Sequence, residues 1–176
     1  MVRFDASSAE CLVFTFKEGL LSAVAHDLKI RVGKFVIEVD EATRAIDARF
    51  DACSLRVACA MNRGSDAPDA LTAANKREIE DNIVRDVLDA RRFPEIRFVS
   101  SAVTVQKAAY AVKGTLTIKE QPRRITVKVR RDDNRYVGES IVHQPDFGIE
   151  PYSALFGALK VKPDVTVRVT VPAVAR

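Results

Sequence analysis

The stretch YAVKGTLTI, from Tyr110 to Ile118, decides the fold class of this chain. Its even positions hold Tyr, Val, Gly, Leu and Ile, and its odd positions hold Ala, Lys and Thr. A period of two is typical of a β-strand that buries one face and exposes the other. The stretch therefore predicts a strand that places Gly114 among its inward-facing residues.

The same alternation recurs elsewhere in the sequence. Residues 164–172 read DVTVRVTVP, with valine at every second position, and residues 125–129 read ITVKV after a turn near Pro122. Segments of this length that are separated by turn residues are typical of neighbouring antiparallel strands. These parts of the chain are therefore predicted to form a run of adjacent antiparallel strands.

In two longer segments the alternation shifts by one residue. The apolar positions change from even to odd at Gly33-Lys34 and again at Cys53-Ser54. Such a shift predicts a β-bulge, which bends and twists a strand. Long bulged strands allow a sheet to curl, so we expect one mainly β domain over residues 1–176, built as an eight-stranded antiparallel barrel.

Residues 72–90 depart from the period of two. Ile79, Ile83 and Val87 recur at every fourth position among charged side chains. This spacing predicts one amphipathic helix, and Thr72 is a suitable N-cap because its hydroxyl can accept a hydrogen bond from a free backbone N–H.

Two further segments lack strand periodicity. Residues 62–69 are rich in polar residues, Gly and Pro, and they predict a loop. Residues 153–159 carry apolar side chains at helical spacing. We expect a short helical segment there, lying across one end of the barrel.

The charge of the chain is modest and mixed. Lys and Arg number 28 and Asp and Glu number 24, which gives a net charge of +4. Basic pairs such as Arg123-Arg124 lie at the edges of expected strands, and no continuous basic block is present. The composition therefore argues against a nucleic-acid-binding surface.

No targeting segment is visible in the sequence. The first residues are interrupted by charges, and no segment reaches the roughly 18 uninterrupted apolar residues of a membrane span. Cys11, Cys53 and Cys59 are odd in number, and their spacing matches no zinc or redox motif. We expect a cytoplasmic protein with reduced thiols and without stable membrane insertion.

The interior of the expected barrel mixes small and large side chains. Ala48, Ala52 and Gly138 fall on the inward faces beside Phe50 and other large residues. A barrel of about eight strands is either filled by its own side chains or wide enough for one slender ligand. Periodicity alone leaves both alternatives open.

Several motifs, taken in order, resemble one known family. They are AHDL at 25–28, GKF at 33–35, FDACSL at 50–55, VLDARRFPEIRF at 87–98, VKGTLTI at 112–118 and DFGI at 146–149. In this order the sequence resembles the YceI-like family, whose members form an extended lipocalin-like antiparallel barrel and include polyisoprenoid-binding proteins. The resemblance implies a lipid-like ligand, whereas many members are exported and this sequence shows no secretory signal.

Catalysis is not expected, because the chain has few groups suited to it. The two histidines, His26 and His143, lack an acidic cluster nearby in sequence, and Asp27 follows His26 on a strand, so the two side chains point to opposite faces. We expect His26 to anchor the start of a strand by a hydrogen bond and His143 to be satisfied at a strand end. No metal site, cofactor or catalytic residue is predicted.

The leading hypothesis is a carrier that encloses an apolar, chain-like molecule such as an isoprenoid. Phe147, Tyr152 and Phe156 are expected to form a gate at the barrel opening. A filled barrel that acts as a partner-binding scaffold, or as a homodimer, is the alternative, and an isomerase or hydrolase is disfavoured because the inward faces hold almost no ionisable groups. The predicted ligand-binding residues are Phe35, Ile37, Phe50, Phe98, Tyr110, Gly114, Leu116, Gly138, Phe147, Tyr152 and Phe156.

Overall fold

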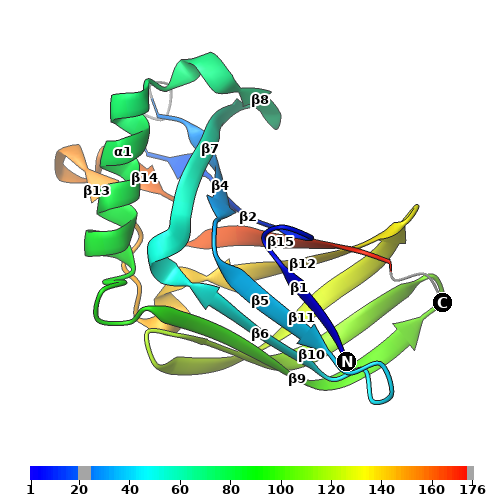
Figure 1. Cartoon of the computed structure of the whole chain (residues 1–176). Helices are drawn as coiled ribbons and strands as arrows, with labels where there is room; N and C mark the ends of the chain where they lie inside the picture. Colours follow the sequence, from blue (N-terminus) through cyan, green and yellow to red (C-terminus); the bar gives the residue numbers. More distant parts are fainter. Residues whose placement is uncertain (20–24, 174–176) are drawn as a thin grey trace.

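An antiparallel sheet of 12 strands curls strongly into a half-barrel (Figure 1). The computed structural model describes residues 1–19 and 25–173. In order of pairing, the strands are β1 (Val2–Asp5), β5 (Phe35–Val39), β6 (Ile46–Asp51), β9 (Glu95–Gln106), β10 (Ala109–Ile118), β11 (Gln121–Asp132), β12 (Arg135–His143), β15 (Asp164–Pro172), β2 (Glu10–Thr15), β4 (Asp27–Val32), β7 (Leu55–Asn62) and β8 (Ser65–Ala67).

The expected number of eight strands is wrong, although the expected curled antiparallel sheet is present. The order of pairing ends at β1 on one side and at β8 on the other. Long chain segments are interrupted, so each contributes two strands: Gly33 and Lys34 separate β4 from β5, and a 3₁₀ turn (Ala52–Ser54) separates β6 from β7. The period of two continues on both sides of each interruption, so each segment looks like one long bulged strand in the sequence. The number of strands is therefore higher than the pattern predicts.

Both interruptions lie where the alternation predicted them, and they are bonded to each other. The Gly33 N–H donates to the Ser54 carbonyl at 2.9 Å, and the Lys34 N–H donates to Ser54 Oγ at 2.9 Å. A Cβ atom on Gly33 would lie 3.0 Å from the Ser54 carbonyl oxygen. The two strands therefore bend at the same level, which turns the β4–β7 part of the sheet away from the β5–β6 part.

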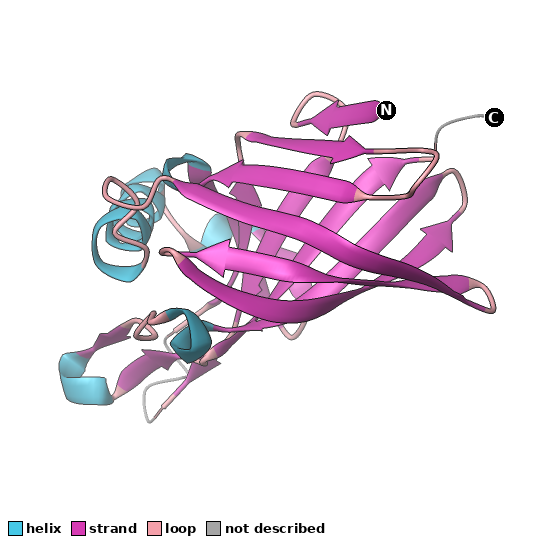
Figure 2. Ribbon diagram, turned by 90° about the horizontal axis from the view of Figure 1, so that it is seen from below, coloured by secondary structure: helices cyan, strands magenta, loops and turns pink. Residues whose placement is uncertain are grey.

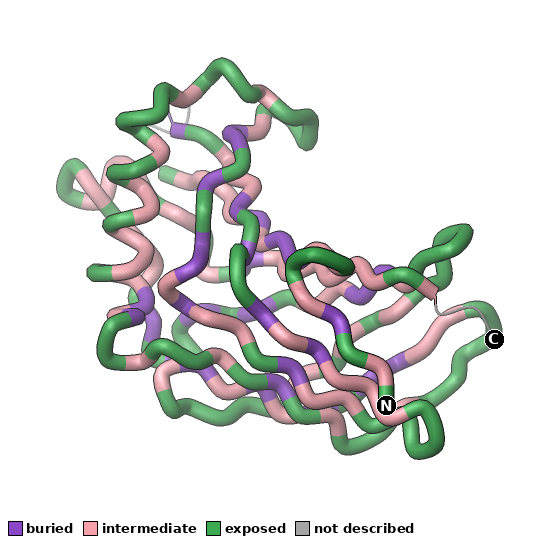
Figure 3. The backbone as a smooth tube through the Cα atoms, in the orientation of Figure 1, coloured by how far each residue is buried: buried purple, intermediate pink, exposed green. Residues whose placement is uncertain are grey.

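The predicted alternation is confirmed in the buried face of the sheet. In β10, Val112, Gly114, Leu116 and Ile118 are buried, and Lys113 between them is exposed. The buried apolar residues of β4, β5, β9, β10 and β12 join into one core on the inner face. Hairpin ends remain exposed (Figure 3).

The helix predicted for residues 72–90 is confirmed, with an altered last turn. Helix α1 spans Ala73–Asn82, and a π-helical turn (Ile83–Val87) continues it. Thr72 forms a capping box, since its Oγ accepts from the Asn75 N–H at 3.1 Å and its own N–H donates to Asn75 Oδ1 at 3.1 Å. The helix stands beside β7 (Figure 1).

The segment 62–69, expected to be a loop, contains a short strand, β8. β8 pairs with β7 across a turn in which Arg63 and Gly64 both have positive φ, a conformation that suits a two-residue hairpin loop. A 3₁₀ turn (Pro68–Ala70) follows and leads to the helix. The missed strand is three residues long, which is too short for a period to be read.

The helical segment expected at residues 153–159 is a hairpin. β13 (Ser153–Ala154) and β14 (Leu159–Val161) pair, and β14 also pairs with β3 (Lys17–Glu18), which makes a second, three-stranded sheet. A 3₁₀ turn (Leu155–Gly157) forms the tip, and another (Gln144–Phe147) follows β12. Figure 2 shows the second sheet beside the helical end of the half-barrel.

In the described ranges, none of the helices is both long enough and apolar enough to cross a bilayer.

Candidate functional site

A cavity of about 180 Å³ lies where α1 covers the inner face of β2 and β4. We call it the helix-side cavity. The second sheet closes another side of it through β14. Its apolar lining consists of Ala25, Leu28, Ile30, Leu71, Ile79, Ile83, Val87, Leu159 and Val161.

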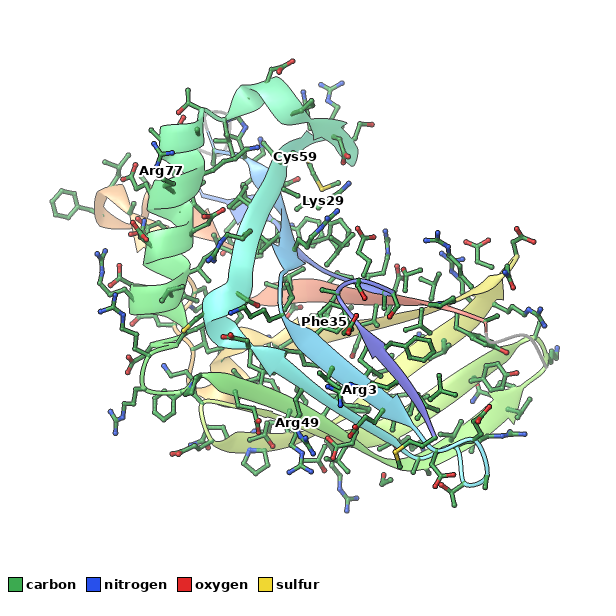
Figure 4. All side chains as sticks on the ribbon, in the orientation of Figure 1. Arg3, Lys29, Phe35, Arg49, Cys59 and Arg77 are labelled. Carbon is green, nitrogen blue, oxygen red and sulfur yellow. The ribbon has the colours of Figure 1, made fainter. Side chains whose placement is uncertain are left out.

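The helix contributes the apolar roof of this cavity. Ile79, Ile83 and Val87 follow one another at intervals of four residues, and all three face the cavity. The π-helical turn is closed by the Leu88 N–H, which donates to the Ile83 carbonyl at 2.9 Å. π-helical turns often occur at functional sites. None of the residues of α1 is fully buried, so the helix is a half-exposed cover, and its Arg77 side is exposed to solvent (Figure 4).

β8 pairs only with Ala60–Asn62 of β7, so the same edge of β7 is free at Val57 and Ala58, and polar side chains of α1 bind there. Glu80 Oε1 accepts from the Val57 N–H at 2.8 Å, and Lys76 Nζ donates to the Ala58 carbonyl at 3.0 Å. An unpaired strand edge leaves N–H and C=O groups without partners. Lys76 and Glu80 supply those partners, so the roof of the cavity is held by hydrogen bonds as well as by apolar contact.

Neutral hydrogen-bonding groups line part of the helix-side cavity. Gln144 is buried, and its Nε2 donates to the Lys162 carbonyl at 3.0 Å. The Tyr152 hydroxyl accepts from Asn82 Nδ2 at 3.4 Å. Among the described residues, no buried side-chain nitrogen or oxygen lacks a partner. His26 and Lys160 also line the cavity, so its wall is mainly apolar with a few polar groups. Such a lining suits an apolar molecule that carries a polar group.

A second, open groove of about 740 Å³ lies at the bend of the sheet. Phe35 and Phe50, paired across β5 and β6, form its apolar floor with ring centroids 5.9 Å apart. Lys34, Arg49 and Asp51 are among its charged lining residues. Because it is open and its charges are of both signs, it encloses an apolar ligand less well than the helix-side cavity does.

Most predicted ligand-binding residues lie away from the helix-side cavity. Tyr152 lines it, and Phe35 and Phe50 line the open groove. Tyr110 packs edge-on against Tyr136, with ring centroids 6.0 Å apart. Five others are buried in strands of the sheet, and these are Ile37, Phe98, Gly114, Leu116 and Gly138. Phe147 is buried in the 3₁₀ turn after β12, and Phe156 is exposed. Their roles in ligand binding stay predictions.

The two strand glycines leave no open space inside the sheet. A Cβ atom on Gly114 would lie 2.5 Å from Phe98 Cζ and 2.5 Å from the Val99 carbonyl oxygen. A Cβ atom on Gly138 would lie 3.1 Å from Val127 Cγ1. Neighbouring side chains therefore fill the space that the sequence suggested for a ligand.

The three aromatic residues expected to form a gate are dispersed. Phe147 is 2% exposed in the core, whereas Phe156 is fully exposed at the tip of the β13–β14 hairpin. Tyr152 alone of the three lines the helix-side cavity. The expectation of a common gate is wrong, because the segment forms a hairpin that points Phe156 outward instead of a helix lying across the opening.

The histidines have separate surroundings. His143 Nδ1 lies 2.6 Å from Asp164 Oδ1 on the paired strand β15, so its satisfied position at a strand end is confirmed. His26 is exposed at the cavity and has no hydrogen bond among the described residues. Asp27 anchors this strand start instead, since its Oδ1 accepts from the Lys17 N–H at 2.8 Å.

The cysteines and carboxylates form no metal-binding group within the described ranges. All three cysteines are free, and burial raises the pKa of the Cys11 thiol to about 12. A thiol with such a pKa is neither a nucleophile nor a metal ligand near neutrality.

The sequence carried part of the signal for the helix-side cavity. The spacing of Ile79, Ile83 and Val87 marked an apolar helix face, but a face of this kind packs against a core as often as it covers a cavity. Leu28 and Ile30 belong to the alternating segment before Gly33, whose period of two marks an inward face but does not assign it to a site. The sequence did not identify Gln144 as a residue of the cavity, because it follows a strand and lies outside any repeating pattern of apolar residues.

The curled antiparallel sheet and its helix-covered apolar cavity define the class of ligand-binding β-barrel folds. Within this class, the chain belongs to the YceI-like family, because residues 4–173 match the YceI-like domain. The resemblance seen in the sequence motifs is thereby confirmed.

Solved structures share this fold at low sequence identity. BcnA of Burkholderia cenocepacia is 18% identical, with 94% of this chain and 96% of that chain covered and a TM-score of 0.65. The YCEI protein of Campylobacter jejuni is 14% identical, with 85% of each chain covered and a TM-score of 0.58. No curated protein sequence matches the chain.

Proposed function

We propose that this protein binds an apolar, isoprenoid-like small molecule in the helix-side cavity. The observation that carries the proposal is an apolar space on the inner face of the sheet, roofed by Ile79, Ile83 and Val87, with the neutral polar groups of Tyr152 and Gln144 beside it. Burial of apolar surface contributes roughly 25 cal/mol per Å² to binding. No catalytic group is needed for this function.

The size of the cavity limits the ligand. Typical pockets for small molecules measure about 300 to 1,000 Å³. A cavity of about 180 Å³ accommodates a short apolar segment, so a long chain needs α1 to move outward. Because no residue of α1 is fully buried, such a movement exposes little apolar surface, but it must break the hydrogen bonds of Lys76 and Glu80 to β7.

Mass spectrometry of an organic extract tests the proposal. Protein purified without detergent is extracted, and we expect an apolar molecule in an amount comparable to the protein. Ile83→Trp, which fills the cavity, should lower the amount recovered, whereas Ile141→Trp on the exposed face of β12 should not. Recovery of equal amounts from both variants, or of none from the wild type, would contradict the proposal.

A further inference from the structure

The tip of the β13–β14 hairpin exposes two large apolar side chains in succession. Leu155 is 61% exposed and Phe156 is fully exposed. Both residues have positive φ angles, 51° and 55°. Figure 1 shows this hairpin projecting beyond α1, away from the main sheet.

The positive φ angles of Leu155 and Phe156 are unfavourable for the backbone, and the exposure of the two side chains to water is unfavourable as well. Bulky L-residues rarely adopt positive φ, and consecutive ones are rarer still. Here the strained backbone directs Leu155 and Phe156 into water instead of into the core. Contiguous exposed apolar side chains are typical of surfaces that contact another protein or a membrane.

A cation lies next to this tip. A Cβ atom on Gly157 would lie 3.1 Å from Lys160 Cε and 3.7 Å from Lys160 Nζ, so the ammonium group lies beside the turn. Lys160 is exposed, and Glu18 is opposite it on β3. Among the described residues, no ion pair joins Lys160 to Glu18 or to another carboxylate. The charge is therefore available to an anionic partner.

The same hairpin forms part of the helix-side cavity. Tyr152, Leu159, Lys160 and Val161 line the cavity on either side of the exposed tip. An apolar molecule that leaves a bilayer at the tip therefore meets the cavity wall within the same hairpin. This continuity favours a lipid surface as the partner.

We propose that the Leu155–Phe156 tip inserts into the interface of an anionic phospholipid bilayer, with Lys160 contacting lipid phosphate. The hairpin then presents the helix-side cavity to the membrane, so that the ligand of the proposed function, on which this inference rests, is collected from lipid. Aromatic and aliphatic side chains at such an interface bury apolar area, and the adjacent cation adds attraction to anionic lipid.

The chain contains no tryptophan, so the fluorescence of one introduced tryptophan reports on this contact alone. Phe156→Trp is mixed with phosphatidylcholine vesicles that contain or lack phosphatidylglycerol. We expect a blue shift of its fluorescence with the anionic vesicles, reduced by added salt and by Lys160→Gln. Ile141→Trp, placed at another exposed apolar residue, should not shift. The absence of a shift for Phe156→Trp, or an equal shift for both variants, would overturn the proposal.

A second variant separates membrane contact from folding. Asn tolerates positive φ better than Phe does, so Phe156→Asn should keep or raise the thermal midpoint. Its partitioning into anionic vesicles should fall about tenfold, since burial of a Phe side chain is lost. Undiminished partitioning of Phe156→Asn would contradict the assignment.

The dependence of the fluorescence on protein concentration distinguishes a membrane from a second copy of the chain as the partner of the tip. A blue shift of Phe156→Trp that appears without vesicles and grows with protein concentration would identify a second copy of the chain as the partner and overturn the membrane proposal. The proposed function is tested separately, because ligand in the organic extract of Phe156→Asn shows that the cavity binds even when membrane contact is lost.

Discussion

At the scale of single residues, Gly114 shows how a residue type can be explained by its neighbour. The pairing of β9 with β10 shifts register at Lys113/Gly114, and the Phe98 ring lies over the glycine. Because a methyl group at this position would overlap the ring and the Val99 carbonyl, packing accounts for the glycine without a ligand. The sequence pattern shows that Gly114 points inward, but it does not show what fills the space.

Gly114→Ala should lower the free energy of unfolding by about 1 to 3 kcal/mol, the usual cost of overpacking. Gly138→Ala is the matched control and should cost less, because its nearest neighbour is a side-chain methyl group of Val127 at 3.1 Å. Denaturant unfolding measures both. Phe98→Leu added to Gly114→Ala should recover part of the loss, and a Gly114→Ala protein of unchanged stability would refute this packing explanation.

A second residue-scale prediction concerns the ion pair between Asp47 and Arg97. Arg97 Nε and Nη2 donate to the two carboxylate oxygens at 3.1 and 2.7 Å, and the hydrogen bond from Arg97 is the main reason that the pKa of Asp47 is lowered. A lowered pKa means that the pair stabilises the folded protein at neutral pH. That contribution is lost as the pH falls below the ordinary value of 3.8 and through the lowered pKa.

Asp47→Asn should therefore lower the free energy of unfolding at pH 7 by about 0.2 to 1 kcal/mol, the range for ion pairs near the surface. The difference from wild type should close on acidification below pH 3.8. Unfolding curves over a pH series measure it. Asp69→Asn, at an exposed position, is the control, and a difference that stays constant with pH would show that the charge is not responsible.

At the scale of elements, α1 combines local and tertiary determinants. Its start is set by the Thr72 capping box, whereas its position depends on Lys76 and Glu80, which bind the free edge of β7. A helix that buries no residue fully needs such attachments to stay in place.

Glu80→Ala should leave the Val57 N–H without an acceptor and lower the free energy of unfolding by about 0.5 to 1.5 kcal/mol. Hydrogen exchange at the Val57 amide should become faster, while the amides of β10 keep their protection. Glu78→Ala, at an exposed position of the same helix, controls for helix propensity. Equal effects of the two variants would mean that the bond to β7 contributes nothing.

Elements with a long repeating pattern could be predicted from the sequence, and short ones could not. The shifts at Gly33-Lys34 and Cys53-Ser54 marked the true breaks in the strands, because buried faces enforce the period. β13 and β14 are two and three residues long, so tertiary pairing with β3 decided their conformation. The helix-side cavity also depends on tertiary contacts, since it exists only where β4, α1 and β14 meet. The sequence pattern of one element therefore could not predict it.

At the scale of the whole molecule, ligand binding and stability are coupled. The cavity is bounded by elements that are distant in sequence, so a bound molecule contacts β4, α1 and β14 together. A ligand that binds the folded state alone stabilises all of these contacts by mass action. Thermal unfolding therefore reports on occupancy of the cavity.

The short isoprenoid alcohol farnesol serves as a probe of this coupling. At a concentration of about 100 Kd, it should stabilise the wild type by about 2.7 kcal/mol. This corresponds to a rise in Tm of about 5 to 10 °C for a domain of this size. Val87→Phe fills the cavity and should abolish the rise, whereas Val105→Phe, the same change at an exposed position, should keep it. If Val87→Phe retains the full rise, farnesol binds elsewhere, and the open groove around Phe35 and Phe50 becomes the site to test.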